Sequence, residues 1–592
     1  MPTRGAYDVA ILGAGLAGLT LARQLLLYSD KTVLLLDKRP KVPSPRQKVG
    51  ESTVQVGAYY YSKVLDLEEY LLHEQLMKYN LRFYWKAGRD NARFEDYGQS
   101  YIRTFSNIAC YQLDRNTFEA ELLRRNVAES RLTFCPGPAD LEVGLRPGGP
   151  HAVRFSVGGA RHDLRAGWVV DATGRGKFLA RRLGLAKENP IRHGASFLWV
   201  DGLVDIDKLT DRSPAEIRLK RERSKIGHSP FWLATNHFMG EGLWFWVIPL
   251  RHKTSLGLVY DTRLVPRERV NSAAKLLRWA CEEFPLFARD LPSRKVLDYN
   301  ALKDFSYDCA QTVSAERWAL AGEAGRFTDP LYSPGSDLIA LHNTLITDAI
   351  LTDDAGELAA KCRLFEPLMR AFYQGTVPSY AVSYDALGDQ EAFTLKYVWE
   401  LSVYFPFHVF PFVNGLFPNP HFIAPYLSRL ARLGPLNRDL QQFISDFYQW
   451  KKQERQPPRR PLFNDFTDVA PLRAAERSFY CVGASPEEGC RLLDTHLANL
   501  AELARFVVAH VSSAVVGDRR ALTNAPFVTE IDLADVRFDP AAIRERYRRH
   551  AGAAETYAWS FDPFVLDLFR ADAPAEAPAP LLAPLAQEAC RA

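Results

Sequence analysis

A glycine-rich turn near the N-terminus has the residue types and spacing that bind a dinucleotide. Its glycines are Gly13, Gly15 and Gly18, in the order G-x-G-x-x-G, and glycine permits the close backbone approach that a pyrophosphate needs. The helix that follows would direct its N-terminal N–H groups and partial positive charge at that pyrophosphate. Asp37, about 20 residues further on, is placed to accept hydrogen bonds from an adenosine ribose. The turn therefore predicts a dinucleotide cofactor.

A second glycine-rich turn occurs much later in the chain. It contains Gly322, Glu323 and Asp329 and lies between an apolar strand and a helix expected near 337–350. Such a turn directs a second helix N-terminus at a flavin, where it favours negative charge on the reduced ring. An ordinary loop between a strand and a helix is the alternative interpretation.

Three further segments and one arginine match motifs of a known family. Arg115 stands where the FAD-dependent monooxygenase superfamily places a cofactor-contacting arginine. The segments resemble those of the flavin-dependent halogenases, a branch of that superfamily, and the likeness extends over residues 5–350. The resemblance implies that these residues contact FAD or line the way to the substrate. They are Lys48, Gly50, Glu51 and Ser52 in the first segment, Asp171 in the second, and Trp244, Trp246, Ile248 and Pro249 in the third.

The resemblance implies a chemistry in which reduced FAD and oxygen oxidise halide to hypohalous acid, which travels through a tunnel to a lysine beside the substrate. Lys78 is the candidate catalytic residue, because 78–85 keeps the lysine, aromatic and tryptophan of the phenol- and pyrrole-type enzymes. An ammonium can hydrogen-bond hypohalous acid, and a desolvated lysine has a lowered pKa and can be halogenated on nitrogen. Considered alone, the residue reads more simply as a surface lysine before an edge strand.

The turn that binds halide in this family differs here. The family binds chloride or bromide through backbone N–H groups of a D-P-x-x-S-S/T-G turn, whereas this chain has Pro334 inside the segment that begins at Asp329. Proline has no N–H, and a lost donor to a buried anion costs on the order of 1.5 to 3 kcal/mol. We expect halide binding to be weakened about tenfold to a hundredfold, or lost. The other residues expected in this part of the tunnel are Tyr332, Ser333 and Ser336, and the neighbouring Gly335 is expected to contact the cofactor.

Tyr332 also bears on the substrate, because the tryptophan halogenases have a glutamate at that position. The resemblance therefore favours a phenolic or other acyl-aromatic compound over indole, free or tethered to a carrier protein. The single dinucleotide fingerprint implies that a separate reductase supplies reduced FAD. Two other interpretations stay open: a halogenase-like monooxygenase or dehydrogenase without halide, and a non-catalytic flavin-binding accessory protein.

The elements that must position these residues follow from the hydrophobic pattern. Apolar runs at 7–12 and 32–36 enclose a helix that ends at Leu27, which is one βαβ unit of an α/β fold. Amphipathic stretches, among them 436–453, predict a helical C-terminal lobe, interrupted at Phe405–Phe412 where prolines oppose a helix. The expected regions are a Rossmann-type FAD-binding region at 1–200, a substrate-side antiparallel sheet at 201–315, a return to the FAD-binding region at 316–350, the helical lobe at 351–570 and a flexible tail at 571–592.

Composition narrows the class of protein. Lys and Arg exceed Asp and Glu by only 74 to 70, so the chain lacks the basic field that nucleic-acid binding needs. The eight cysteines form no C-x-x-C pair, which argues against a zinc or iron–sulfur site and for reduced thiols in the cytoplasm. The sequence contains no uncharged run of about 18 apolar residues, the length that a membrane-spanning helix needs. His237 and His342 lie in apolar surroundings and are interpreted as hydrogen-bonded core histidines rather than catalytic ones.

Overall fold

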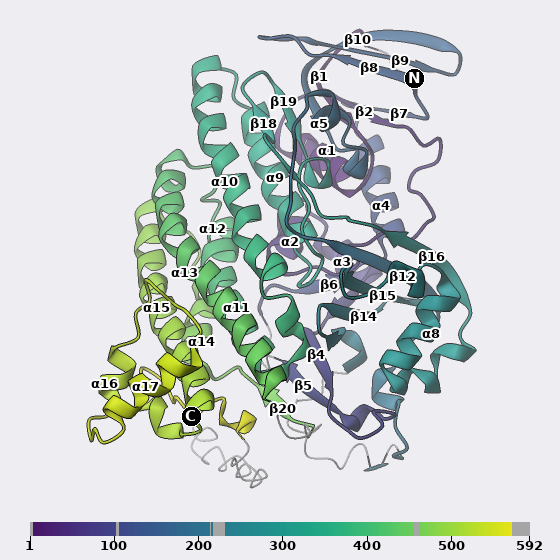
Figure 1. The fold of residues 1–592 in the computed structure, drawn as a ribbon. Helices are drawn as coiled ribbons and strands as arrows, with labels where there is room; N and C mark the ends of the chain where they lie inside the picture. Colours follow the sequence, from purple (N-terminus) through teal and green to yellow (C-terminus); the bar gives the residue numbers. More distant parts are fainter. Residues whose placement is uncertain (1–3, 102–105, 214, 217–230, 455–460, 571–592) are drawn as a thin grey trace, which may run out of the picture.

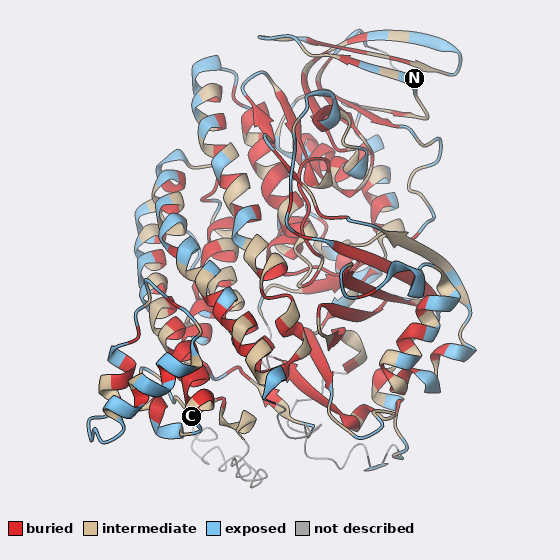
Figure 2. Ribbon diagram, in the orientation of Figure 1, coloured by how far each residue is buried: buried red, intermediate tan, exposed pale blue. Residues whose placement is uncertain are grey.

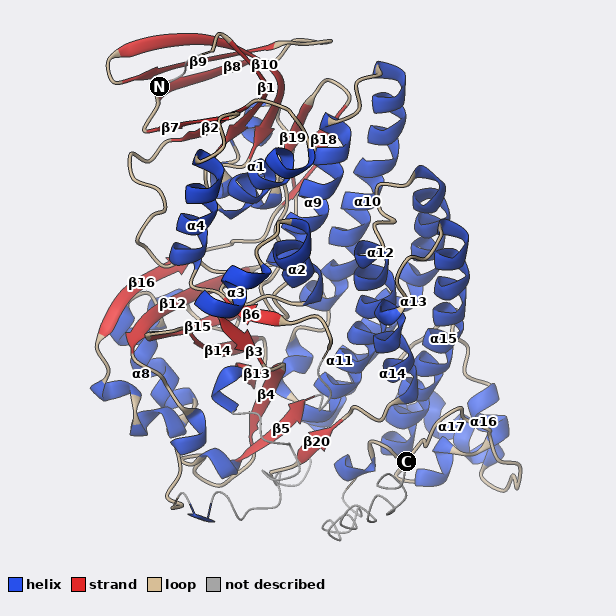
Figure 3. Cartoon of the chain, turned by 180° about the vertical axis from the view of Figure 1, so that it is seen from behind, coloured by secondary structure: helices blue, strands red, loops and turns tan. Residues whose placement is uncertain are grey.

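The computed structural model describes residues 4–101, 106–213, 215–216, 231–454 and 461–570. Figure 1 shows a sheet that carries the N-terminus, a second sheet beside it, and long helices packed along one side of both. The view from behind in Figure 3 shows the same three parts. The predicted tail at 571–592 lies outside the described residues.

The first sheet is the Rossmann-type sheet that the sequence predicts. Five parallel strands run in the order β19-β10-β1-β2-β7, and the strand residues of β2 are buried throughout, as expected for a sheet covered on both faces. Helix α1 (Leu16–Tyr28) connects β1 to β2. The strands are β1 (Ala6–Leu12), β2 (Val33–Asp37), β7 (Leu132–Pro136), β10 (Ala160–Asp171) and β19 (Trp318–Leu320).

The second sheet is mostly antiparallel, with the order β16-β12-β15-β14-β13-β4-β5-β20. Strand β14 (Leu243–Pro249) separates two cores because side chains alternate between the faces of a strand. Trp244, Trp246 and Ile248 join the core shared with the Rossmann-type region, while Phe245 and Val247 join a core on the other face. The remaining strands are β4 (Leu81–Lys86), β5 (Tyr97–Tyr101), β12 (His193–Asp201), β13 (Thr235–Gly240), β15 (Lys253–Asp261), β16 (Val296–Leu302) and β20 (Phe463–Asp465).

The helical region begins after α9 (Gly335–Ile350), which still belongs to the Rossmann-type region. Its inward faces are buried and its outward faces exposed (Figure 2), so each helix is held by one apolar face. Strand β20 comes from within this region and pairs with β5 of the second sheet, which ties the two parts together. The longest helices are α10 (Ala355–Ala381), α11 (Gln390–Tyr404), α13 (Pro420–Gln453) and α15 (Pro486–Val516).

One expectation about this region was wrong, and one helix is longer than expected. The segment at 405–412 stays helical, as a π-turn over Phe405–Val409 followed by α12 (Phe410–Val413). Pro406 and Pro411 lie inside one helical run that continues from α11, because Tyr404 and Val409 are themselves helical, and the run changes to a π-turn where the first proline occurs. The helix expected at 436–453 begins at Pro420, because the side chain of Asn419 caps it.

Helix α15 is the element that comes nearest to a membrane span among the described helices, although Glu502 and Arg505 lie within it. Among the described helices it is long and apolar enough by length and composition, although 67% of its most apolar window is buried inside the fold. A buried core helix passes the same test.

Candidate active site

The first glycine turn is built for close approach. Gly13 has φ +110°, and a Cβ there would lie 2.4 Å from the carbonyl oxygen of Ala172. A Cβ on Gly18 would lie 1.9 Å from the carbonyl oxygen of Gly13. At Gly15, which begins α1, a Cβ would meet no described atom within 4 Å, and no described side chain caps the helix. The mouth of α1 is therefore open to an anionic ligand such as a pyrophosphate.

Asp37 lies at the end of β2, with its carboxylate against this turn. One oxygen accepts the N–H of Ala14 at 2.8 Å, and Arg39 donates to both oxygens. Burial opposes ionisation, but these hydrogen bonds outweigh it and lower the pKa of Asp37. The carboxylate is thus held ionised and shapes the glycine turn, whether or not it also meets a ribose.

The loop that contains Lys48 and Gly50 is fixed by α4 (Arg115–Val127). The buried carboxylate of Glu119 pairs with Lys48 at 2.5 Å and with Arg115 at 2.5 Å. Arg115 also donates to the carbonyl of Val49 at 2.7 Å. Gly50 has φ +97°, and a Cβ there would lie 2.8 Å from Nη1 of Arg115. The predicted arginine therefore holds the loop in place.

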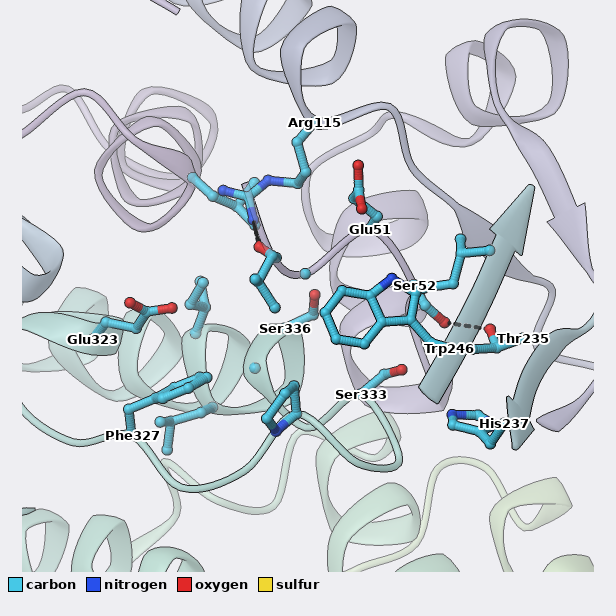
Figure 4. A pocket seen from close by; sticks show the side chains of 18 of the residues that line it. Glu51, Ser52, Arg115, Thr235, His237, Trp246, Glu323, Phe327, Ser333 and Ser336 are labelled. Carbon is cyan, nitrogen blue, oxygen red and sulfur yellow. Dashed lines mark hydrogen bonds between the residues drawn. The ribbon is translucent and has the colours of Figure 1, made fainter. Parts of the chain in front are cut away.

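A cavity, here called the smaller cavity, opens between these elements (Figure 4). Of the predicted cofactor residues it contains Gly50, Glu51, Ser52, Arg115, Glu323 and Gly335. Of the predicted tunnel residues it contains Trp244, Trp246, Ile248, Ser333 and Ser336. Leu16 of α1 and Gly335 of α9 both line it, so two helix N-termini begin at its wall, which is the arrangement that a flavin dinucleotide requires.

The second sheet contributes a polar and aromatic wall. The indole of Trp246 packs against Gly257 on the neighbouring strand, where a Cβ would lie only 2.2 Å from the ring. Nε1 of Trp246 donates a hydrogen bond to Oγ of Ser255 at 3.0 Å. Glu51 accepts a hydrogen bond of 2.7 Å from Nε1 of Trp199, and burial raises the pKa of Glu51 to about 7. Pro249 ends β14 and is not among the residues that line the cavity.

Several predicted cofactor residues also stabilise turns. Asp171 accepts hydrogen bonds from the N–H groups of Thr173 and Leu179. Asp329 accepts the N–H of Leu331 at 2.8 Å and is bonded to the buried His193 ring at 2.6 Å. Five predicted cofactor residues are not among the described residues that line the smaller cavity: Asp37, Lys48, Asp171, Gly322 and Asp329.

The predicted halide turn leads directly into α9. Tyr332 and Ser333 have φ of +67° and +60°, and the N–H of Ser333 is donated to the carbonyl of Pro330 at 2.9 Å. Pro334 follows as the residue before α9, which begins at Gly335 without a side-chain cap from any described residue. Donors for an anion at this point would therefore come from the first turn of α9, since Pro334 has no N–H.

Lys78 lies at the boundary between the smaller cavity and a larger one. Its ammonium donates to Oγ of Ser52 at 3.1 Å and to the carbonyl of Thr53. Ser52 lines the smaller cavity, whereas Lys78 lines the larger one. Burial lowers the pKa of Lys78 to about 8. The simpler interpretation of a surface lysine is therefore wrong, because the side chain is 8% exposed.

The larger cavity, here called the chamber, has a volume of about 610 Å³. It lies between Lys78 and the Tyr332–Pro334 turn on one side and helices α10, α11 and α13 on the other. Phe327, Gly335 and Leu338 line both cavities, so the two cavities share a wall.

Two residues of the site were not identified as functional from the sequence. Asp337 in the first turn of α9 lines the chamber and accepts hydrogen bonds from the Gly57 N–H and the Tyr404 hydroxyl, both at 2.7 Å. Burial raises the pKa of Asp337 to about 7. His237, interpreted as a core residue, is buried and bonded to the carbonyl of Arg82 at 3.1 Å, yet its ring also lines the smaller cavity.

Comparison with known proteins finds relatives in sequence and in fold. A family model of NAD(P)-binding Rossmann-like domains matches residues 11–78. The chain is 25% identical over 456 residues to the flavin-dependent halogenase chlA of Dictyostelium discoideum, covering 70% of this chain and 74% of that protein. It is 24% identical over 393 residues to the 1H-pyrrole-2-carbonyl peptidyl-carrier-protein chlorinase of Pseudomonas fluorescens, covering 63% and 80%. The crystal structure of halogenase PltM in complex with phloroglucinol and FAD has the same fold, with a TM-score of 0.57, 16% identity and coverage of 83% and 96%.

The fold and the site define an FAD-dependent oxidoreductase with a Rossmann-like nucleotide-binding domain. Within that class the chain is similar to flavin-dependent halogenases, the family that its sequence motifs resemble.

Proposed function

We propose that the protein is an FADH2- and oxygen-dependent halogenase that acts on a phenolic or other conjugated aromatic substrate. Lys78 carries this proposal, because it faces the chamber while its hydrogen bond to Ser52 ties it to the wall of the smaller cavity. Bound reduced FAD, together with oxygen, supplies the oxidising equivalent for halide. The chain's own task is to hold the cofactor between two helix mouths and to receive the oxidised halogen at Lys78.

The hydrogen bonds of Lys78 explain how it can serve either form of halogen transfer. An ammonium has three donors, and Ser52 and the carbonyl of Thr53 take two of them. The protonated form has one N–H left for hypohalous acid. The neutral form keeps both existing bonds and has a lone pair left for halogenation. A pKa of about 8 populates both forms near neutral pH.

The names of the relatives support aromatic substrates of two kinds. PltM was solved with the free phenol phloroglucinol, and the pyrrole chlorinase is named for a carrier-bound acyl group. A separate reductase would supply the reduced flavin to this chain, as its single nucleotide fingerprint implies.

Pro334 favours one second candidate, an FAD monooxygenase of the same fold that does not use halide. Assays with chloride, with bromide and without halide, followed by mass measurement of the products, distinguish the two. Halogenated product that requires added halide supports halogenation. Equal turnover without halide, with an oxygenated or dehydrogenated product, contradicts it.

A further inference from the structure

The helical wall of the chamber contains a carboxylate that the proposed function leaves unused. Glu400 on α11 lines the chamber. Its Oε1 accepts hydrogen bonds from Nζ of Lys396 and, at 3.1 Å, from Nε2 of Gln441. Its Oε2 is buried and has no hydrogen-bond partner among the described residues. One oxygen is therefore held in place while the other remains available to a ligand.

The charge of Glu400 is already matched within the protein. Lys396 is 0% exposed and also donates to Oγ of Ser379 at 2.5 Å and to the Gln441 amide oxygen at 3.3 Å. Because an adjacent buried cation neutralises the carboxylate, a second cation from a ligand would meet repulsion from Lys396. The free oxygen is suited to a neutral hydrogen-bond donor, such as a hydroxyl group.

Tyr332 places a second polar atom on the wall of the same chamber. Its ring stacks on Tyr397 with centroids 4.9 Å apart and meets Phe83 edge-on at 6.2 Å. The hydroxyl is buried without a hydrogen-bond partner in the described part of the chain. Burial, the charge of Glu400 and the approach of the Tyr332 hydroxyl toward the Glu400 carboxylate together raise the pKa of Tyr332, which keeps its hydroxyl protonated and able to donate.

The size of the chamber restricts what occupies it. Its volume of about 610 Å³ lies within the range of roughly 300 to 1,000 Å³ that drug-sized ligands fill. A single phenolic ring would leave much of this volume empty. A ligand with two or more rings can contact Lys78 and the helical wall at once.

We infer that Glu400 and Tyr332 form a subsite that binds a hydroxyl group of a neutral aromatic substrate with more than one ring. The substrate hydroxyl donates to Oε2 of Glu400 and accepts from the hydroxyl of Tyr332. By anchoring this group, the subsite determines which ring carbon lies against Lys78. Only this last consequence rests on the proposed halogenation.

Binding of two-ring phenols to the FAD-loaded protein tests the subsite without turnover. The probes are 4,4′-dihydroxybiphenyl, its dimethyl ether, and a 4-hydroxybiphenyl that carries an aminomethyl group in place of the second hydroxyl, each measured by calorimetry. We expect the dihydroxy probe to bind about tenfold to a hundredfold more tightly than the dimethyl ether, the range for a hydrogen bond to a charged group. The aminomethyl probe should gain nothing from its ammonium group.

Two variants and one control assign the effect to residues. Glu400→Gln and Tyr332→Phe should each remove most of the preference for the dihydroxy probe. Tyr373→Phe is the matched control, because Tyr373 comes from α10 and also lines the chamber with a hydroxyl that has no partner among the described residues. If Glu400→Gln fails to fold with Lys396 unpaired, Tyr332→Phe carries the test.

The inference is overturned if the wild-type protein binds none of the probes, or binds the dimethyl ether as tightly as the dihydroxy compound. An equal loss in Tyr373→Phe also contradicts it. These results are independent of whether the enzyme halogenates, which is measured separately by product mass. If binding behaves as expected and no halogenated product forms, the subsite stands and the proposed function falls.

Discussion

Replacing Lys78 by methionine should abolish product formation and, at neutral pH, relieve a cost to stability. Burial lowers the pKa of Lys78 from 10.5 to about 8, and each pKa unit corresponds to about 1.4 kcal/mol. Holding the charged form in the folded protein therefore costs about 3 kcal/mol below pH 8. Methionine is similar in length and uncharged, but it loses the hydrogen bonds to Ser52 and the Thr53 carbonyl.

The pH dependence separates the charge effect from the lost hydrogen bonds. Between pH 8 and 10.5 the unfolded chain keeps the Lys78 proton while the folded wild-type protein has released it, so unfolding takes up a proton. The free energy of unfolding of the wild-type protein therefore rises with pH in this window. The variant lacks this contribution. The free energy of unfolding of the wild type, relative to that of the variant, should therefore increase by about 3 kcal/mol from pH 7 to above pH 10.

Equilibrium urea unfolding at both pH values, together with FAD content and product assays, provides the measurement. Lys63→Met is the matched control, because Lys63 is an exposed lysine paired with Glu68. It should show no such pH-dependent difference and should keep full activity. The reasoning about Lys78 is refuted if Lys78→Met retains product formation, or if its stability difference from the wild type does not change with pH.

The remaining predictions concern the halide turn, the cofactor turn and the acid beside Lys78. Pro334→Ser restores an N–H before α9 and should lower the bromide concentration for half-maximal turnover about tenfold to a hundredfold; an unchanged bromide titration would show that the turn does not bind halide. Gly18→Ala places a Cβ 1.9 Å from the carbonyl oxygen of Gly13 and should yield protein that lacks FAD or does not fold. The control Gly335→Ala should fold normally, because the nearest atom to a Cβ there is 3.9 Å away. Normal FAD content in Gly18→Ala would contradict this account of the turn. Asp337 has a pKa raised to about 7, so its ionisation above that pH stabilises the charge of the Lys78 ammonium, and Asp337→Asn should remove a limb near pH 7 from the kcat/KM profile. An identical profile in the variant would exclude Asp337 from the titration.

The Rossmann-type unit could be predicted because its signal is local. The strand expected at 7–12 and the helix expected to end at Leu27 lie within a residue of β1 and α1. Gly18 is required because a Cβ there would clash with Gly13 in the same turn, and Gly13 because a Cβ there would clash with Ala172, which follows β10. The aromatic wall of β14 was also predictable, since its alternating pattern specifies one face.

Other features depend on partners that are distant in the sequence. Asp329 is bonded to His193 and Tyr384, two partners that its own motif does not indicate. The polar wall of the chamber combines Tyr332 with Glu400 and Gln441 from two helices, and no local spacing relates them. The helical segment after Tyr404 was missed because α11 passes into a π-turn and then into α12 without a break at its prolines, which proline content alone does not predict.

A crystal structure of the protein with FAD and bromide tests the central claim most directly. The account predicts the flavin ring in the smaller cavity between Ser52 and Trp246, anomalous bromide density at the first turn of α9 beside Ser333, and Lys78 facing the chamber on the other side of the shared wall. Flavin bound elsewhere, or Lys78 separated from both cavities, would contradict it.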